Sequence, residues 1–297
     1  MVIFILLISW FTMLKKFWIV LVCIFMISTT SADSLLKSGS KLSAISYNVW
    51  FDSDTAPSRY PAILELIADL DSDIGFLQEV TPIFIENYTS SEFKKNYFFY
   101  STPNAKRSYG LAYISKAPLY YTKVFKLPSQ YQRTVFFAAM EVSRSDWLLL
   151  ANVHLESGSG EKAMRGEQVN MINDTLMPDY IAEFRNYHPE ANVVGIIFGG
   201  DFNIENTEHH VSLEKNWQDA VLKTKDLQRM TYDIKHNPLA RSFFHWFQHS
   251  SRLDRFYLKS LDKKIEVGSY RVIDSIRGKT NMLSDHYPIS INVNLRR

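Results

Sequence analysis

The sequence predicts an α/β domain, and three observations support this prediction. The chain has 297 residues, of which 46% are apolar, enough for one large core. Short apolar runs typical of strands alternate with two stretches of helical spacing. The segment 193–198, Val-Val-Gly-Ile-Ile-Phe, is a nearly continuous apolar run bounded by glycine, which indicates a strand buried on both faces.

The residues after this run combine flexibility with polarity. Gly199 and Gly200 let another backbone or a ligand approach closely. Asp201 and Asn203 are spaced i, i+2, so in an extended chain they point the same way. A carboxylate beside an amide at a strand end is suited to holding a water or a metal against a phosphate. Taken alone, the segment favours a simple turn after a core strand, because Asp and Asn are common turn residues.

The other elements follow from the same periodicities. Expected strands cover residues 42–49, 73–79, 93–100, 109–114, 134–142, 147–155, 253–258, 265–272 and 287–293. Helical spacing covers 58–70, with Pro61 in its first turn, and 161–187, with an interruption near Met177-Pro178. Residues 206–245 are polar, aromatic and irregular, which indicates a long surface excursion over a site. Its aromatics Phe243, Phe244, Trp246 and Phe247 favour core packing, with base stacking as the alternative.

The first 32 residues have the composition of an export signal. They carry Lys15 and Lys16, no acid, an apolar run and a small-residue end, Thr30-Ser31-Ala32. The segment is therefore predicted to be a signal peptide, or an N-terminal apolar anchor if it is not cleaved. Its removal takes the net charge from +2 to 0, which argues against a strongly basic nucleic-acid coat. Cys23, the only cysteine, leaves with it, so no disulfide or thiolate site is expected.

Polar residues recur at the ends of the expected strands. They are Asn48, Glu79, His154, Asp201, Asn203, Asp254, Asp285 and His286. Each one alone fits a turn, a solvated strand end, a surface ion pair or a satisfied core histidine. Ligands of α/β sheets gather at strand ends, and the joint occurrence in one chain indicates a site.

Six motifs occur in a fixed order along the chain. They are Ser-Tyr-Asn-Val-Trp (46–50), Leu-Gln-Glu-Val (77–80), His-Leu-Glu-Ser (154–157), Gly-Gly-Asp-Phe-Asn (199–203), Leu-Asp-Arg-Phe (253–256) and Ser-Asp-His-Tyr-Pro (284–288). As an ordered set they resemble the endonuclease/exonuclease/phosphatase superfamily of metal-dependent phosphoesterases. The resemblance covers about residues 42–295. It implies a four-layer α/β (α+β) sandwich, two packed mixed β-sheets flanked by helices, in one catalytic domain over 33–297.

Within that superfamily the sequence is most similar to the tyrosyl-DNA phosphodiesterase 2 branch. Arg165 and Gln168 after His-Leu-Glu-Ser, the segment Thr231-Tyr232-Asp233, and Tyr109 before Gly110 are typical of it. One position departs, because Glu205 stands where that branch usually carries an arginine. An acid near a polyanionic substrate weakens binding, so the departure bears on the substrate.

The resemblance implies three groups of site residues. They are catalytic Asp201, His286, His154, Asn203 and Asp254; metal-binding Glu79, Asn48 and Asp285; and substrate-binding Tyr109, Arg165 and Ser157. Glu79 is the first choice of ligand for Mg²⁺ or Mn²⁺, which prefer oxygen donors. Asp201 is expected to orient and deprotonate the attacking water. The two histidines are expected to donate to phosphoryl oxygens, with Asp254 orienting His286.

Three classes of function remain open from the sequence. The first is a secreted or periplasmic phosphodiesterase acting on nucleic acid or a tyrosyl-DNA-like ester. The second is a phospholipase C of the sphingomyelinase type, and the third is a non-catalytic binding module on the same fold. For the first class the expected partner is a phosphodiester such as DNA. A monomer without stable membrane association is expected after signal cleavage, and a membrane-anchored protein if the signal stays.

Overall fold

The structure is a computed structural model that describes residues 41–296. The residues left out of this range are 144, 207, 209–212, 214–215, 225–226, 228, 243–248, 263–264, 277–278 and 281. The predicted signal, Cys23 and the four aromatics at 243–247 therefore lie outside the described residues, and the predictions made for them stay predictions. Within the described residues, every helix is too short or too polar to cross a membrane.

Two six-stranded mixed sheets form the centre of the described part of the chain. The order in the first sheet is β11 (Ile265–Val272), β14 (Ile289–Leu295), β1 (Lys41–Asn48), β2 (Ile74–Val80), β4 (Gly110–Ser115), β3 (Phe98–Ser101). The order in the second sheet is β5 (Tyr120–Lys126), β6 (Thr134–Glu141), β7 (Asp146–His154), β8 (Asn192–Asp201), β10 (Asp254–Ser260), β9 (Gln218–Asp219). A further short pair joins β12 (Ser275–Ile276) to β13 (Lys279–Thr280).

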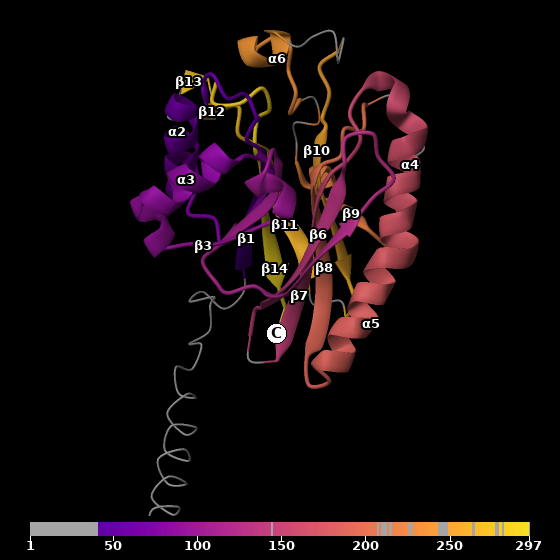
Figure 1. Ribbon diagram of the computed structural model, residues 1–297. Coiled ribbons are helices and arrows are strands. Elements are labelled where there is room, and N and C mark those ends of the chain that lie inside the picture. The colour runs from indigo at the N-terminus through magenta and orange to yellow at the C-terminus, as the bar shows by residue number, and fades with distance from the viewer. Residues whose placement is uncertain are drawn as a thin grey trace, which may run out of the picture. The chain divides into compact units, whose positions relative to one another are not determined.

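Helices cover the outer face of each sheet (Figure 1). Helices α2 (Ala56–Asp69) and α3 (Pro82–Ser90) share one apolar cluster with β1, β2 and β4. Helices α4 (Lys162–Met171) and α5 (Met177–Tyr187) share another with β6, β7 and β8. The remaining helical turns are η1 (Glu92–Lys95), η2 (Pro103–Lys106), η3 (Ser159–Glu161), η4 (Ile172–Leu176, a π-helix), η5 (Ala220–Lys223) and α6 (Pro238–Ser242). These layers confirm the predicted four-layer sandwich.

Each sheet has one parallel pair at its centre, and this arrangement places the site. In the first sheet β1 runs parallel to β2, and in the second β7 runs parallel to β8. All other pairings in the two sheets are antiparallel. The carboxyl ends of these four strands carry Asn48, Glu79, His154 and Asp201. The side chains of all four meet, as the hydrogen bonds of Asn48 and the close approach of His154 to Glu79 and Asp201 show.

Strand β8 is longer than the apolar pattern predicts. It continues through both glycines to Asp201, because the neighbouring strands leave no room for side chains there. A Cβ at Gly199 would collide with the ring of Phe256, and one at Gly200 would collide with the Val153 carbonyl. Gly200 also has φ of +141°, a conformation that favours glycine. The glycines therefore bring the backbone of β8 close to β7 and β10 and carry Asp201 into the site.

Other boundaries differ from the sequence-based expectation for local reasons. Residues 93–100 are not one strand, since Phe93 lies in η1 and stacks on Tyr97, and only β3 is extended. Helix α3 and strand β5 were not predicted. Helix α2 begins earlier than expected, so Pro61 lies inside it and not in its first turn. The long helix changes to π geometry over η4, directly before Met177.

Candidate active site

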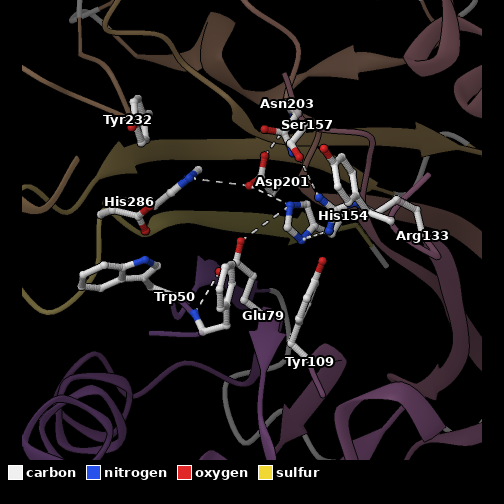
Figure 2. A pocket seen from close by; sticks show the side chains of 13 residues that line it. Trp50, Glu79, Tyr109, Arg133, His154, Ser157, Asp201, Asn203, Tyr232 and His286 are labelled. Atoms are coloured by element: carbon white, nitrogen blue, oxygen red, sulfur yellow. Dashed lines mark hydrogen bonds and ion pairs between the residues drawn. The ribbon is translucent and has the colours of Figure 1, made fainter. Parts of the chain in front are cut away.

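A cavity of about 320 Å³ opens where the strand ends of the two sheets meet (Figure 2). Its lining combines acids and imidazoles with aromatic rings and one arginine. The lining residues are Trp50, Phe51, Glu79, Tyr109, Tyr131, Arg133, His154, Ser157, Asp201, Asn203, Tyr232, Asp285 and His286. Most of the predicted site residues therefore line one space, and Asn48 and Asp254 contact it from behind through hydrogen bonds.

Asp201 lies at the centre of the polar groups. Its Oδ2 is 3.5 Å from Nε2 of His154 and 3.7 Å from Nε2 of His286. The same oxygen accepts a hydrogen bond from Nδ2 of Asn48 at 3.0 Å. Its Oδ1 accepts from the backbone N–H of Asn203 at 2.9 Å, so the carboxylate is fixed on both sides.

Asn48 joins the two sheets through its side-chain amide. Besides Asp201, its Nδ2 donates to Oε1 of Glu79 at 3.0 Å. Its Oδ1 accepts from the backbone N–H of Trp50 and so faces away from the carboxylates. With this orientation Asn48 supports the two acids and does not itself offer a ligand oxygen. Glu79 is held at its second oxygen by the backbone N–H of Phe51 at 2.9 Å.

His286 is oriented from behind by an acid, as predicted. Oδ2 of Asp254 lies 2.8 Å from Nδ1 of His286, and both side chains are buried. Asp254 itself does not line the cavity. Its backbone N–H donates to the Thr231 hydroxyl. The imidazole thus keeps Nε2 directed at Asp201 and the cavity.

Arg133, which is not among the predicted site residues, fixes the tautomer of His154. Its Nη1 lies 2.9 Å from Nδ1 of His154. A guanidinium only donates, so Nδ1 accepts and the ring hydrogen of neutral His154 is on Nε2, facing Asp201. Nη2 of Arg133 also donates to the hydroxyl of Ser157 at 3.1 Å. Arg133 therefore organises one side of the cavity.

The charges of the site follow from burial and close neighbours. Burial, followed by the charge of Arg133, holds the pKa of His154 well below its usual value, so this ring is neutral. Burial opposes the charge on His286, but Asp254, Asp201 and Asp285 together hold its pKa well above the usual value. Burial also opposes ionisation of Asp201, yet the two histidines and the hydrogen bond from Asn48 outweigh it and lower its pKa. The centre is thus a carboxylate beside an imidazolium.

Glu79 and Asp285 differ from Asp201, because their positive neighbours do not outweigh the effect of burial on their pKa values. Burial, then repulsion from Asp285, raises the pKa of Glu79 to about 7 despite hydrogen bonds from Asn48 and Phe51. Burial raises the pKa of Asp285 as well, against the opposing effect of His286. Two crowded carboxyl groups with oxygen donors only, lining one cavity, fit a hard divalent cation such as Mg²⁺ or Mn²⁺. A cation bound between the two groups would offset their negative charges and lower both pKa values.

A second set of atoms has the spacing of a metal site but is less suited to one. Atoms of Asp201, Asp254 and His286 lie within 4.8 Å of one another. Two of these residues already share the 2.8 Å hydrogen bond between Asp254 and His286, and Asp254 does not line the cavity. Glu79 with Asp285 is therefore the better place for a cation.

Three cavity residues have backbone conformations that are rare outside glycine. The φ angles are +59° at Trp50, +58° at Glu79 and +51° at Asn203. Such conformations cost on the order of 1 kcal/mol or more each and persist where the surroundings enforce them. At Asn203 the surroundings are the hydrogen bonds to Asp201 and, through Nδ2, to the Leu155 carbonyl at 3.0 Å. The positive φ means that Asn203 reaches the cavity by a turn and not by simple i, i+2 alternation.

Aromatic rings form the walls of the cavity. Tyr109 stacks on Phe51 with ring centroids 5.1 Å apart and an angle of 17°. The guanidinium of Arg133 lies 5.9 Å from the ring of Tyr109 and 5.6 Å from that of Tyr131. Phe51 and Tyr131 are both exposed. The walls thus offer flat apolar faces to whatever group is attached to a bound phosphate.

The structure does not bring Arg165 to the cavity, which corrects its prediction as a substrate-binding residue. Its side chain is completely buried and pairs with Glu208. It also donates to the carbonyls of Glu156 and Gly158, on both sides of Ser157. Arg165 therefore shapes the loop that carries Ser157. Ser157 and Tyr109 do line the cavity, and their predicted role in substrate binding stays a prediction.

The fold and this cavity together define a two-sheet sandwich protein with a polar site across the carboxyl ends of its central strands. The chain belongs to the Endonuclease/Exonuclease/phosphatase family, whose sequence model matches residues 45–286. Among curated proteins, no sequence match is found.

Solved structures support the same fold. A truncated TDP2 from Caenorhabditis elegans superposes with a TM-score of 0.68 at 22% identity, covering 86% of this chain and 98% of that one. TDP2 from D. rerio, complexed with single strand DNA product, gives 0.68 and 22% over 86% and 99%. A mannosyl-6-phosphatase from Bacteroides thetaiotaomicron gives 0.63 and 16% over 85% and 99%. At these identities the likeness establishes the fold.

Proposed function

We propose that the protein is a secreted, Mg²⁺- or Mn²⁺-dependent phosphodiesterase. The observation that carries this proposal is the convergence of Glu79, His154, Asp201, Asp285 and His286 on one cavity from both sheets. Phosphoryl transfer needs little covalent chemistry from the protein, but it needs positioning and compensation of charge on the equatorial oxygens. The cavity offers both.

The residues divide the work according to their charges. Asp201, ionised and fixed by Asn48 and Asn203, holds the attacking water and accepts its proton. His286, charged and held by Asp254, donates from Nε2 to a phosphoryl oxygen. Neutral His154 donates from Nε2 in the tautomer that Arg133 imposes.

A divalent cation at Glu79 and Asp285 would supply charge neutralisation and stabilise the leaving oxygen. Glu79 must be ionised to hold it, and the hydrogen bonds from Asn48 and Phe51 aim its two oxygens. Asn48 orients Glu79 and Asp201 with one amide group, so the position of the cation and that of the attacking water are coupled through this chain's own side chains.

The preferred substrate is a phosphodiester in nucleic acid or a tyrosyl-DNA-like ester. The aromatic walls and Arg133 suit an aromatic group next to the phosphate. A structural neighbour carries single strand DNA product, which supports the same direction. Glu205 lines a second cavity together with Arg252 and Arg255.

The test compares four substrates with the purified protein and Mg²⁺: a 5′-tyrosyl oligonucleotide, plain duplex DNA, sphingomyelin and a sugar phosphate. Each is repeated with excess chelator and with Asp201→Asn. Chelator-sensitive release of tyrosine that Asp201→Asn abolishes supports the proposal. Release of phosphocholine supports the phospholipase alternative, and release of phosphate from the sugar supports a phosphatase. The absence of all four reactions in a folded, metal-binding protein refutes the phosphodiesterase assignment.

Secretion has its own test. The protein expressed from the full sequence in an exporting host is collected, and its N-terminal residues are determined. A chain beginning near residue 33 outside the cytoplasm supports the predicted signal, and an uncut chain retained with membranes supports the anchor.

A further inference from the structure

Strand β2 is irregular at the residue that we assign to the metal. Its pairing with β4 is regular up to Leu77 opposite Ala112, then shifts register before Val80 opposite Gly110. Gln78 and Glu79 lie in the shift, and Glu79 has a φ of +58°. A bulge of this kind redirects a side chain. Because the conformation of Glu79 is unfavourable on its own, surrounding contacts must hold it.

Asn152 supplies such contacts from the opposite sheet. It lies in β7 and is completely buried. Its Nδ2 donates to the carbonyls of Leu77 at 3.1 Å and Ala112 at 2.9 Å, the last regular pair before the shift. Its Oδ1 accepts from Nε2 of Gln78 at 2.8 Å. The side-chain amide of Asn152 therefore forms three hydrogen bonds with residues where the bulge begins.

The same amide lies directly behind the catalytic residues of the second sheet. Asn152 precedes His154 by two residues in β7, and the ladder pairs it with Gly199, two residues before Asp201. Gln78 directly precedes Glu79. The hydrogen bond between Asn152 and Gln78 thus connects the strand ends that carry His154 and Asp201 to the strand end that carries Glu79.

Stability alone does not require this arrangement. Buried polar groups of this kind are often replaced by apolar groups of similar shape at little cost. Within the described residues, the buried Oε1 of Gln78 has no hydrogen-bond partner, which costs about 1–3 kcal/mol. Asn152 and Gln78 form a buried polar pair between the two sheets and leave one acceptor without a partner. The backbone geometry that the pair enforces explains this arrangement better than stability does.

We propose that Asn152 is a positioning residue, which fixes the bulge of β2 and thereby aims the carboxylate of Glu79 into the cavity at a set distance from Asp201. The proposal rests on the proposed function only in assigning the cation to Glu79. It predicts that loss of the amide loosens residues 78–80 and weakens metal binding, whatever the substrate is.

The test measures Mn²⁺ affinity by calorimetry, without substrate, for the wild type and Asn152→Leu. We expect the affinity to fall at least 10-fold in the variant. Gln78→Met removes the bond to Oδ1 of Asn152, together with the bonds of Gln78 to the Ser46 hydroxyl and the Phe76 carbonyl. It leaves both bonds from Asn152 to the carbonyls of Leu77 and Ala112, so a loss below about 3-fold is expected there. Val293→Ala is the control, because Val293 is buried at the far end of the first sheet, paired with Leu42. It should lower the Tm without changing the Mn²⁺ affinity.

A second measurement does not depend on metal. Amide hydrogen exchange at residues 78–80 should be at least 10-fold faster in Asn152→Leu than in Val293→Ala. The two variants are compared at temperatures equally far below their own Tm values. If Asn152→Leu does not fold, Asn152→Ser, whose hydroxyl donates to one carbonyl only, should show an intermediate effect. Unchanged exchange at 78–80 overturns the proposal, as does unchanged Mn²⁺ affinity in a folded variant. A wild type that binds no Mn²⁺ refutes the metal assignment instead, and exchange then decides the role of Asn152.

Discussion

The 2.8 Å contact between Nδ1 of His286 and Oδ2 of Asp254 places a charged donor at the edge of the cavity. Asp254, Asp201 and Asp285 outweigh the burial of His286 and hold its pKa well above the usual value. Nε2 of the same ring lies 3.7 Å from Asp201, so the histidine is bracketed by two acids. The neighbouring acids therefore keep His286 charged, and substitution of each acid tests its contribution.

Asp254→Asn should remove most of that support. The amide keeps the shape but not the charge, so the pKa of His286 falls and the ring loses its proton at lower pH. We expect turnover to fall roughly 100-fold, as for loss of one charge-stabilising donor. The alkaline limb of the pH–rate profile should also move to lower pH. Asp146→Asn is the matched control, because Asp146 begins β7 at the end opposite to His154. It should leave the turnover and the alkaline limb unchanged. An unshifted alkaline limb would contradict the assigned role.

Arg133→Met should release the tautomer of His154. The variant keeps the length of the side chain but loses the donor to Nδ1, so the ring hydrogen no longer has one fixed position. The pKa of His154 should rise, because the charge of Arg133 is, after burial, the largest cause of its lowering. Turnover should fall about 10-fold or more, and the ring ¹⁵N shifts of His154 should report a mixed tautomer. Arg107→Met, an exposed arginine near Tyr109, is the control. A ring that stays in one tautomer without Arg133 would rule out this role.

Glu79→Gln should stabilise the metal-free protein at alkaline pH. Burial raises the pKa of Glu79 from 4.5 to about 7. Its stabilising contribution is present in full below pH 4.5, declines as the unfolded chain ionises first, and is lost above pH 7. Glutamine stays neutral, so at pH 8 the free energy of unfolding should rise by on the order of 1–3 kcal/mol, and at pH 4 it should not.

Addition of Mg²⁺ should instead stabilise the wild type relative to Glu79→Gln. Mg²⁺ at pH 8 should raise the Tm of the wild type, because a ligand that binds only the folded state stabilises it, and should leave Glu79→Gln unchanged. Thermal denaturation at pH 4, 6 and 8, with and without Mg²⁺, measures both effects. Equal Tm shifts by Mg²⁺ in the two proteins would exclude Glu79 as the ligand.

The acids and imidazoles that line the cavity could be picked out from the sequence because they mark the ends of its strands. Asn48, Glu79, His154 and Asp201 end the two central parallel pairs, whose carboxyl ends share one edge. Arg133 carries no such mark, since it precedes β6 instead of ending a strand. The position of Arg133 near the site could still be predicted, because β6 and β7 form the predicted hairpin. Their pairing of Val135 with Val153 places Arg133 next to the strand end that carries His154.

The bulge at Glu79 and the positive φ at Asn203 are harder to predict from the sequence. Neither residue is a glycine, and both conformations are imposed by hydrogen bonds from distant segments, such as the carbonyl of Leu155 that accepts from Asn203. Helical spacing likewise places Arg165 on a face of α4 but does not say whether that face meets the cavity or the core. The ion pair with Glu208 holds the Arg165 side chain in the core.

Arg165→Met should therefore act on stability more than on substrate binding. The change leaves Glu208 buried without its partner, which typically costs about 3–5 kcal/mol, and frees the carbonyls of Glu156 and Gly158. The free energy of unfolding from urea denaturation should fall by that amount, while KM changes less than about 3-fold because Arg165 does not line the cavity. The double variant Arg165→Met/Glu208→Leu should recover much of the loss, since it removes the unpaired charge. A KM increase of 10-fold or more at unchanged stability would restore the substrate contact that the resemblance implied.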